Sequence, residues 1–398
     1  MPPPLHNVPL CVDGRMLGGN GTGVGSYARA LASAQSEIST RALVLHDRSS
    51  LGEASGAGER FGRWVRASLP FAATASLAAP SKSPAPDGAR TLFGTDLFRL
   101  AQVYFDVQRR LLTVRTPGIR GIMHWTYPVP LRLEGWTNLY TIHDAIPLLH
   151  ADLTAIDGRR HARLLRQVAG SAELLVTVSN AARDEIAAVL QCSPERIVNC
   201  GIAVEAGRLA SEPPADLASR GYLLVCGSVE ARKNVAAILA AHRASGTSLP
   251  LVIAGPESAL GSKLEAKIRA MGALRLKALN RAEMEALIGH ARALLMPSLA
   301  EGFGLPVAEA MTLGTPSVIS TVPALLETAA GAALVVDPRD VAALAEAINS
   351  VSTDDRLYAQ LAKRGKDAAS RFSPERFRDR LSALYQRFGP QTDAHAAG

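Results

Sequence analysis

Two glutamates, Glu301 and Glu309, are separated by seven residues in a segment that favours a loop followed by a helix. Pro306 suits the first helical turn, because its missing N–H would be unpaired there and its φ is already helical. Good helix formers follow, and Gly314 is typical of a helix end. We therefore expect Glu301 on the loop and Glu309 about one turn inside the helix. The unpaired N–H groups at the helix start would form a site for an anion.

A basic pair, Arg232 and Lys233, follows the apolar run Tyr222–Cys226, which is typical of a buried strand. A helix is expected to begin near Asn234. The two cations would then lie at the carboxyl end of a strand and in front of a helix N-terminus, where parallel α/β sheets hold anionic groups. Taken alone, the same residues are equally compatible with a solvated helix start.

Glycines, among them Gly23 and Gly25, are concentrated in residues 18–27, after the first expected strand and before a helix. The backbone can approach a phosphate closely at glycine because no Cβ intervenes. The spacing is not that of the dinucleotide-binding fingerprint. An ordinary flexible connection between a strand and a helix is an equally good interpretation.

Histidines and neighbouring polar groups end two further expected strands. His143 and Asp144 end one of them, and His124 and Tyr127 lie at the end of another. A single histidine at a strand end is most often structural, and aromatic residues there often simply pack. Because the carboxyl ends of parallel strands share one edge of a sheet, we expect these residues to line the same cleft as the glycines.

The elements that must position these groups follow from the hydrophobic pattern. Short apolar runs alternate with helical patterns, which indicates an α/β fold with parallel sheets. Each half of the chain carries about six such runs, which predicts two doubly wound, Rossmann-like domains. The expected strands are Val8–Val12, Ala42–His46, Gly121–Trp125, Asn138–His143, Leu174–Ser179, Ile197–Cys200, Tyr222–Cys226, Leu251–Ala254, Leu274–Leu279, Ala293–Met296, Ser317–Ile319 and Ala333–Val336.

Three segments between or after these elements have their own signals. Residues 211–216 have the composition of a linker between domains, and the stretch Ala72–Arg90 is expected to be a mobile surface loop. Ser373 and Pro374 suit the cap and first turn of a last helix. Its apolar stripe would carry Phe377, Leu381, Leu384, Tyr385 and Phe388.

Length and composition bound the class of protein. The chain has 398 residues, which favours two domains over a single core, and its 47% hydrophobic and 20% charged residues are ordinary for a globular protein. No apolar run reaches the roughly 18 residues of a membrane span. The start lacks the basic and apolar regions of a signal peptide. The four scattered cysteines are expected to be buried thiols in a reducing cytoplasm.

The glutamate segment resembles the signature of the retaining glycosyltransferases of family 4, in which seven residues separate two glutamates. The resemblance extends to Leu295–Ser298 before the segment and to Gly314–Ser320 after it. The run Ala231–Asn234 resembles the family's Pro-Arg-Lys-Asn element, with Ala231 in place of the proline. The resemblance covers residues 8 to 390. It implies the GT-B fold, in which two Rossmann-like domains face each other across a cleft and a C-terminal helix crosses back to the N-domain.

The resemblance also implies domain limits and residue roles. Residues 1–210 would bind the acceptor, residues 211–372 the nucleotide sugar, and residues 373–398 would form the crossing helix and a tail. The implied catalytic residues are His143, Glu301 and Asp144; the donor-binding residues are Arg232, Lys233, Glu309, Phe303, Gly304, Leu305, Gly23 and Gly25; and the acceptor-side residues are His124 and Tyr127.

Some family features are altered or missing. Ala278 and Leu279 stand where a glycine near the nucleobase is usual, and Pro323–Glu327 replaces a usual Pro-Glu-Val. The chain has no Asp-x-Asp motif, through which many glycosyltransferases hold a divalent metal. We therefore expect basic side chains and helix N-termini to neutralise the donor diphosphate, with no required metal and no other cofactor.

The implied reaction moves a hexose, with mannose preferred, from a nucleotide diphosphate sugar to a saccharide or lipid-linked saccharide. It would proceed with retention, during assembly of a cell-surface polysaccharide. A glycoside hydrolase that uses both carboxylates is one alternative. A nicotinamide-dependent oxidoreductase that uses the glycines is another, and an inactive homologue serving as a partner subunit is a third.

The distribution of charge indicates an anionic partner. The net charge is +7, and the whole excess falls within residues 15–120. Within that region, residues 60–71 mix arginines with Phe61, Trp64, Val65 and Leu69, which could form an interfacial anchor. A solvated helix packed on the sheet is the alternative. We expect a cytoplasmic protein, peripheral on the inner face of the membrane, and no nucleic-acid partner.

Overall fold

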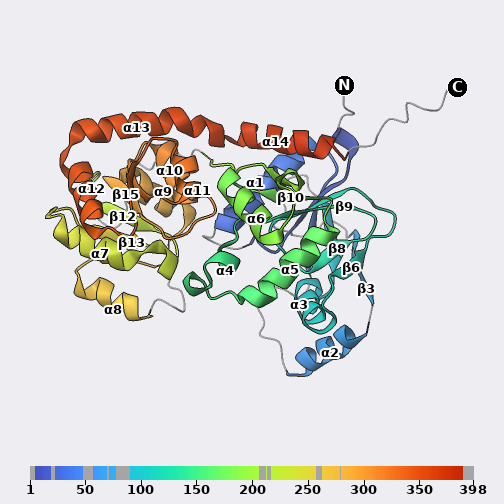
Figure 1. Cartoon of the computed structure of the whole chain (residues 1–398). Coiled ribbons are helices and arrows are strands. Elements are labelled where there is room, and N and C mark those ends of the chain that lie inside the picture. The colour runs from blue at the N-terminus through green and yellow to red at the C-terminus, as the bar shows by residue number, and fades with distance from the viewer. Residues whose placement is uncertain are drawn as a thin grey trace.

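The computed structural model of the chain describes residues 5–18, 23–47, 57–69, 71–77, 90–205, 212, 217–256, 262–277 and 279–388. They form two α/β units that lie side by side, one from each half of the chain (Figure 1). Every expected strand is present within a few residues of its expected bounds. The predicted architecture of two doubly wound, largely parallel sheets is therefore confirmed.

The first unit is built on an eight-stranded sheet with the order β11-β10-β9-β7-β1-β2-β5-β4. Its strands are β1 (Leu10–Asp13), β2 (Ala42–Asp47), β4 (Ser76–Leu77), β5 (Arg90–Gly94), β7 (Ile122–Trp125), β9 (Thr137–Thr141), β10 (Leu174–Thr177) and β11 (Ile197–Asn199). All neighbours pair in parallel except β4, which runs antiparallel to β5. Because helices cover both faces, every residue of β1, β7 and β10 is buried.

The second unit is built on a six-stranded, fully parallel sheet with the order β14-β13-β12-β15-β16-β17. Its strands are β12 (Leu223–Cys226), β13 (Leu251–Ala254), β14 (Leu274–Leu276), β15 (Ala293–Met296), β16 (Ser317–Ser320) and β17 (Leu334–Val336). Its core consists of two apolar layers, one on each face of the sheet.

Both sheets have a point at which the strand order reverses. In the first unit it lies between β1 and β7, and in the second between β12 and β15. In open α/β sheets the crevice outside the carboxyl ends of the strands at this point is where ligands bind. The segments that follow these strands are the ones the sequence singled out, so the fold collects the candidate residues at two crevices.

The helices surround both sheets (Figure 1). They are α1 (Gly23–Ile38), α2 (Ala57–Ser68), α3 (Leu97–Gln108), α4 (Ile146–Leu149), α5 (Gly158–Ser171), α6 (Asn180–Leu190), α7 (Val235–Ala244), α8 (Ser262–Ala270), α9 (Arg281–His290), α10 (Leu305–Leu313), α11 (Pro323–Ala329), α12 (Val341–Thr353), α13 (Asp355–Ala369) and α14 (Pro374–Gln386). Short 3-10 turns lie at Leu5–Asn7, Ala151–Leu153, Pro194–Arg196, Ala231–Lys233 and Ser370–Phe372. Within the described residues, no helix combines the length and apolar character needed to cross a bilayer.

The last helix crosses from the second unit back to the first, as expected (Figure 1). Ser373 caps α14 by accepting a hydrogen bond from the Arg376 amide, and Pro374 follows in the first turn. The apolar stripe of α14 is buried in the core of the first unit, beside residues of α1. Because that core is shared by segments more than 300 residues apart in sequence, α14 ties the two units together.

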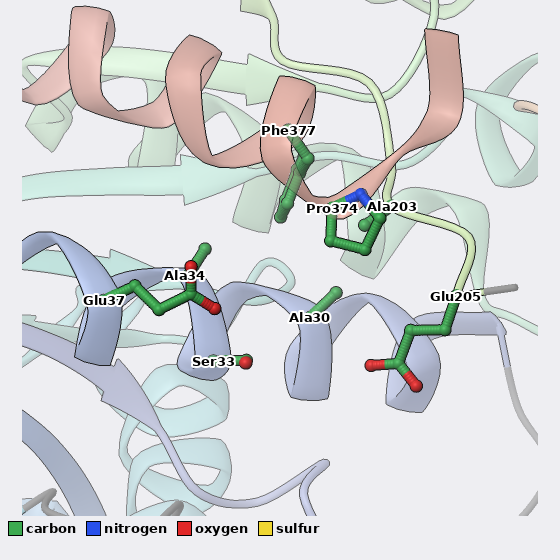
Figure 2. A pocket seen from close by; sticks show the side chains of 8 residues that line it. All are labelled: Ala30, Ser33, Ala34, Glu37, Ala203, Glu205, Pro374 and Phe377. Carbon is green, nitrogen blue, oxygen red and sulfur yellow. The ribbon is translucent and has the colours of Figure 1, made fainter. Parts of the chain in front are cut away.

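The seam between α14 and α1 is closely packed. Figure 2 shows Phe377 and Pro374 pointing toward α1, from which Ala30 points back. The pocket left at this seam measures about 20 Å³, with Glu37 and Glu205 at its rim. A space of that size holds little more than a water molecule, so the seam is a packing interface.

One expectation about the first unit is wrong. The stretch Ala72–Arg90 is not a loop throughout, since it contains β3 (Ala72–Thr74) and β4. Strand β3 belongs to a small parallel sheet with β6 (Leu112–Arg115) and β8 (Leu131–Leu133), an element that the sequence did not predict. Each of these strands is only three or four residues long, so its few apolar residues do not stand out in the sequence as a strand. Residues 78–89 lie outside the described residues.

The predicted linker cannot be compared in the same way. Residues 211 and 213–216, and the limit expected between residues 210 and 211, lie outside the described residues. The three domain ranges therefore stay predictions, whereas the two sheets and the crossing helix are described directly.

Candidate active site

The centre of the candidate site is a carboxylate held by two cations. Arg232 and Lys233 lie in the turn after β12, and Glu301 lies in the loop after β15, the neighbouring strand at the point of reversal. Arg232 Nη1 donates to Glu301 Oε1 at 2.7 Å, and Lys233 Nζ lies 2.8 Å from the same oxygen. Glu301 is 9% exposed and Lys233 is 7% exposed. The adjacency of β12 and β15 brings together residues that are 69 positions apart.

The charges of this cluster stabilise one another. Burial alone would raise the pKa of Glu301, but Lys233 and Arg232 outweigh it and hold that pKa below its usual range. Arg232 also donates from Nε to Glu230 Oε2 at 2.9 Å. Burial lowers the pKa of Arg232, whereas Glu301 and Glu230 more than offset this and raise it. Arg232 and Glu301 are therefore both charged near neutral pH, so the cluster presents fixed charge at the crevice.

The second glutamate of the motif has a different partner. Glu309 is the fifth residue of α10, as expected, and is 6% exposed. Its carboxylate accepts a hydrogen bond from Arg281, the first residue of α9, which also pairs with Glu285. Burial raises the pKa of Glu309, and Arg281 counteracts only part of that effect. Arg281 is a site residue that the sequence pattern does not predict. Its only local signal is a basic residue after the Asn280 cap.

The start of α10 requires a glycine. Gly304 has φ 95°, in the left-handed region, and precedes Leu305 and Pro306 of the first turn. The amides at a helix start have no acceptor within the helix, so this end of α10 presents N–H donors. Phe303 packs against the cores of both units, with its ring 5.5 Å from that of Phe372. The Phe303–Leu305 stretch therefore lies at the junction of the units.

His143 and Asp144 reach the same place from the first unit. His143 Nε2 lies 2.9 Å from the Thr126 carbonyl oxygen, which can only accept, so this nitrogen carries the proton. Burial lowers the pKa of His143 to about 4, and the ring is neutral at pH 7. Asp144 Oδ1 accepts from the Ile146 amide at 3.0 Å. Burial raises the pKa of Asp144, while the field of Arg232 lowers it.

Backbone contact joins these residues to the Glu301 loop. A Cβ placed on Gly302 would overlap the carbonyl oxygen of His143 and crowd the Cβ of Asp144. Only glycine allows this approach. The structure thus brings the predicted catalytic residues His143, Asp144 and Glu301 together with Arg232 and Lys233.

The two predicted glycines lie in α1. Gly23 is its first residue, and a Cβ placed there would lie 3.8 Å from Leu305 Cδ2 at the start of α10. The N-termini of α1 and α10 therefore approach each other across the junction. Gly25 is buried within α1. The glycine-rich residues 19–22 lie outside the described residues.

The acceptor-side prediction for His124 does not fit its position. His124 has no exposed surface, its Nδ1 lies 2.8 Å from Tyr385 Oη, and its Nε2 lies 2.9 Å from Thr141 Oγ1. Burial, with a smaller effect of His143, lowers the pKa of His124 to about 3. Successive strand residues face opposite sides of a sheet, and His124 faces the crossing helix instead of the cleft. Tyr127 is half-buried, and the Arg15 guanidinium carbon lies 5.9 Å from the centre of its ring. Its role stays a prediction.

No group of three or more histidine, cysteine, aspartate or glutamate side chains within the described ranges is arranged to hold a metal ion. The prediction that no metal is required stays a prediction.

The candidate site combines two cations, two helix N-termini, a neutral histidine and two buried carboxylates. Such a set suits an anion attached to a polar, hydroxyl-rich group.

Comparisons with known proteins agree on the class of this protein. The family model described as "Glycosyl transferases group 1" matches residues 215–368. The O-antigen chain mannosyltransferase B of Escherichia coli is 32% identical over 264 residues, covering 62% of this chain and 69% of the relative. The serotype-specific mannosyltransferase WbdA of E. coli is 24% identical over 275 residues, covering 63% of this chain but only 33% of WbdA.

The fold has many solved counterparts. Sucrose-phosphate synthase from Thermosynechococcus elongatus superposes with a TM-score of 0.68 at 16% identity, covering 96% of this chain and 99% of that one. At this identity the likeness shows the fold alone.

Proposed function

The chain belongs to the glycosyl transferases of group 1, and on that premise we propose that it transfers mannose from a nucleotide diphosphate sugar to a saccharide or lipid-linked saccharide. Membership makes the chain a transferase with the GT-B fold. The preference for mannose is supported by the names of the O-antigen chain mannosyltransferase B and of WbdA. Assembly of a cell-surface polysaccharide is the proposed setting.

The observation that carries the proposal is the pairing of Arg232 and Lys233 with Glu301 at the crevice of the second sheet. Departure of a nucleoside diphosphate develops negative charge on the leaving oxygen. Preorganised cations and helix N-termini stabilise such charge without reorganisation during the reaction. In the proposal, Arg232, Lys233 and the N-termini of α10 and α1 face the diphosphate, while Glu301 keeps both cations in place and accepts hydrogen bonds from sugar hydroxyls.

The nucleoside end of the donor is assigned to Glu309. A carboxylate inside the first turns of α10 suits the two hydroxyls of a ribose, and its present partner Arg281 keeps it oriented. Arg281 itself is half-exposed, so it can remain in place beside a bound nucleoside. The amides of Phe303, Gly304 and Leu305 serve the sugar and phosphate groups next to it.

The sugar and the acceptor meet at His143. Its neutral ring donates from Nε2 to Thr126, which leaves Nδ1 as an acceptor for a sugar hydroxyl. No side chain of the cluster is an obvious nucleophile, and we propose same-face attack with retention. The acceptor oxygen bonds to the anomeric carbon, the bond from that carbon to the diphosphate breaks, and the acceptor proton goes to the departing diphosphate oxygen.

The three alternative functions from the sequence are not equally compatible with the family. A glycoside hydrolase and a nicotinamide-dependent oxidoreductase do not agree with the family, which consists of sugar transferases. An inactive homologue that acts as a partner subunit would keep the fold and lose turnover. The experiment below separates it from an active enzyme.

The proposed acceptor is carried by an anionic membrane surface, and α2 is the element that suits it. Phe61, Trp64, Val65 and Leu69 are 66%, 54%, 45% and 68% exposed. The rings of Phe61 and Trp64 stack with centroids 6.3 Å apart. Figure 1 places α2 at the outer edge of the first unit, away from the second unit. Exposed aromatic residues beside arginines fit the headgroup region of an anionic leaflet, which on the cytoplasmic side attracts basic segments.

Thermal unfolding with UDP-, GDP-, ADP- and TDP-sugars, with and without EDTA, tests the donor assignment. We expect GDP-mannose to raise the midpoint in both conditions, because a ligand at a hundred times its Kd stabilises the folded state by roughly 2.7 kcal/mol. Loss of the effect with EDTA would contradict metal independence. If no nucleotide sugar shifts the midpoint, the inactive homologue becomes the better interpretation. If GDP-mannose does stabilise the protein, the anomeric signal of the transfer product by NMR shows whether the configuration is retained.

A further inference from the structure

The N-terminus of α6 in the first unit is capped by a carboxylate from the second unit. Glu327 of α11 accepts hydrogen bonds at Oε1 from the Asn180 amide at 2.9 Å and from Asn180 Nδ2 at 3.0 Å. Its Oε2 accepts from the Ala181 amide at 2.9 Å. A carboxylate at a helix N-terminus is stabilised both by the orphan amides and by the helix dipole. The contact joins residues 147 positions apart.

The cap of the same helix makes a second bridge between the units. Ser179 Oγ accepts from the Ala182 amide at 3.0 Å and donates to the Gly302 carbonyl oxygen at 2.6 Å. Ser179 is 1% exposed, so this bond is shielded from water. Gly302 is the residue whose backbone touches His143 and follows Glu301 directly.

Helix α11 itself is fastened to the Glu301 loop. Thr328 Oγ1 donates to the Phe303 carbonyl oxygen at 2.6 Å, and Arg371 donates to the Thr328 carbonyl oxygen. Arg371 lies in the turn before α14 and is in the field of Glu327. One continuous set of bonds therefore runs from α6 through α11 to the loop that carries Glu301.

We propose that Glu327 is a positioning residue that latches α11 onto α6 and so holds the Glu301 loop against His143. Without this latch the junction would rest on the Ser179–Gly302 bond, on the packing of Phe303 against both cores and on the crossing helix α14, and no charged contact among the described residues would fix the spacing of the two units beside the Glu301 loop. The sugar-binding groups of the two units would then no longer be held at one distance. The inference rests on the proposed transfer only for its kinetic readout.

The first test compares Glu327→Ala with the control Glu346→Ala, which removes an exposed glutamate from α12 in the same unit. Solution scattering of the ligand-free proteins should show a larger radius of gyration for Glu327→Ala only. Hydrogen exchange at the Asn180 and Ala181 amides should accelerate roughly tenfold or more in Glu327→Ala, because their charged acceptor is lost. Scattering curves and exchange rates that match the wild type would overturn the latch.

The second test uses GDP-mannose turnover, followed as released GDP. For Glu327→Ala we expect kcat to fall roughly tenfold while the Kd of GDP, whose proposed ligands all lie in the second unit or at α1, stays within about twofold. Glu327→Gln should recover part of kcat, since its amide oxygen can still accept the two bonds that Oε1 receives from Asn180. An altered scattering curve with unchanged kcat would refute the positioning role. Absence of any turnover in the wild type would instead refute the proposed donor and leave scattering to decide the latch.

A second variant disturbs the contact between the Glu301 loop and His143 directly, without changing Glu327. Gly302→Ala introduces a Cβ that cannot coexist with the His143 carbonyl in the latched arrangement. It should open the junction and lower kcat even with Glu327 intact. A Gly302→Ala protein with wild-type scattering would show that the loop moves away from His143 without any change in the arrangement of the units, contrary to the proposal.

Discussion

At the residue scale, the site depends on charges that are buried in pairs. Glu301 is held by two cations and Glu309 by one, and both carboxylates have little exposed surface. A buried pair gives little net stability, but removing one partner leaves an uncompensated charge and is costly. Variants at these positions must therefore be judged by ligand affinity against a control that changes the local charge by the same amount.

Glu309→Gln should weaken GDP binding by roughly tenfold, because a ribose hydroxyl loses a charged acceptor. Isothermal titration with GDP measures the Kd. Glu285→Gln is the matched control, since Glu285 also pairs with Arg281 but lies on α9. Equal affinities for both variants and the wild type would remove Glu309 from the nucleoside site.

His124 should make stability depend on pH in a defined window. Its folded pKa of about 3 lies below the ordinary value of about 6.5 for histidine. Between these values the unfolded chain binds a proton that the folded chain does not. The stabilisation is therefore fully present above about pH 6.5 and is lost as the pH falls, by roughly 1.4 kcal/mol per pH unit.

Urea unfolding at pH 7 and pH 5 of the wild type and His124→Gln isolates this effect, since glutamine can replace both hydrogen bonds without titrating. Between pH 6.5 and pH 5 the wild type should lose about 2 kcal/mol more than the variant. Parallel losses in the two proteins would mean that His124 keeps its proton affinity on folding.

At the element scale, α14 completes the hydrophobic core of the first unit. Its apolar stripe covers one face of α1. In addition, Tyr385 Oη accepts a hydrogen bond from Gln35 Nε2 at 2.9 Å and contacts His124. A polar network buried this deeply fixes the register of the helix, because shifting it would leave several buried groups unpaired. The predicted apolar stripe is confirmed, whereas its polar contacts were not foreseen.

Leu381→Ala should lower the free energy of unfolding of the first unit by about 2–5 kcal/mol, the usual cost of a cavity in a packed core. Leu381 has no exposed surface and lies at the contact between α14 and the first unit. Gln386→Ala, at an exposed position of the same helix, should change it by less than about 0.5 kcal/mol. Urea titration measures both, and a similar small effect of the two substitutions would show that α14 is not part of that core.

At the scale of the whole molecule, the starts of α1 and α10, which follow strands β1 and β15 at the two reversal points, approach each other, and the excess positive charge belongs to the first half of the chain. The crossing helix and the contacts of α6 with α11 join the units around the candidate site. The net charge of +7 lies within residues 15–120, and the described part of that range belongs to the first unit. A molecule with this asymmetry would approach an anionic surface with its first unit.

Replacing Arg60 and Arg66 by glutamine should reduce binding to vesicles of phosphatidylserine and phosphatidylcholine at low salt, by roughly 1 kcal/mol for each charge. Arg63 is left in place because it is paired with Asp96 at 2.8 Å. Arg339→Gln with Arg356→Gln removes the same charge from exposed positions of the second unit and serves as the control. Vesicle sedimentation that falls equally for both double variants would assign binding to net charge instead of α2.

Local chemistry was sufficient to predict a large part of the molecule. The strands follow from apolar runs, and the placement of Glu301 before a helix and Glu309 inside it follows from Pro306 and Gly314, because capping and propensity act over a few residues. The same holds for Ser373 and Pro374 at the start of α14. These features depend only on neighbours in the sequence.

Contacts between distant segments were decided by the tertiary structure. Whether His124 faces the cleft or the helix layer depends on which side of the sheet α14 covers, and Arg281 meets Glu309 only because α9 and α10 pack together. The pairing of Glu327 with α6 is of the same kind. The sequence by itself determined the strands of the two large sheets, the last helix and the family, since these are encoded locally. The partners of each charge came from packing, because a side chain's surroundings are supplied by residues that the pattern around it does not contain.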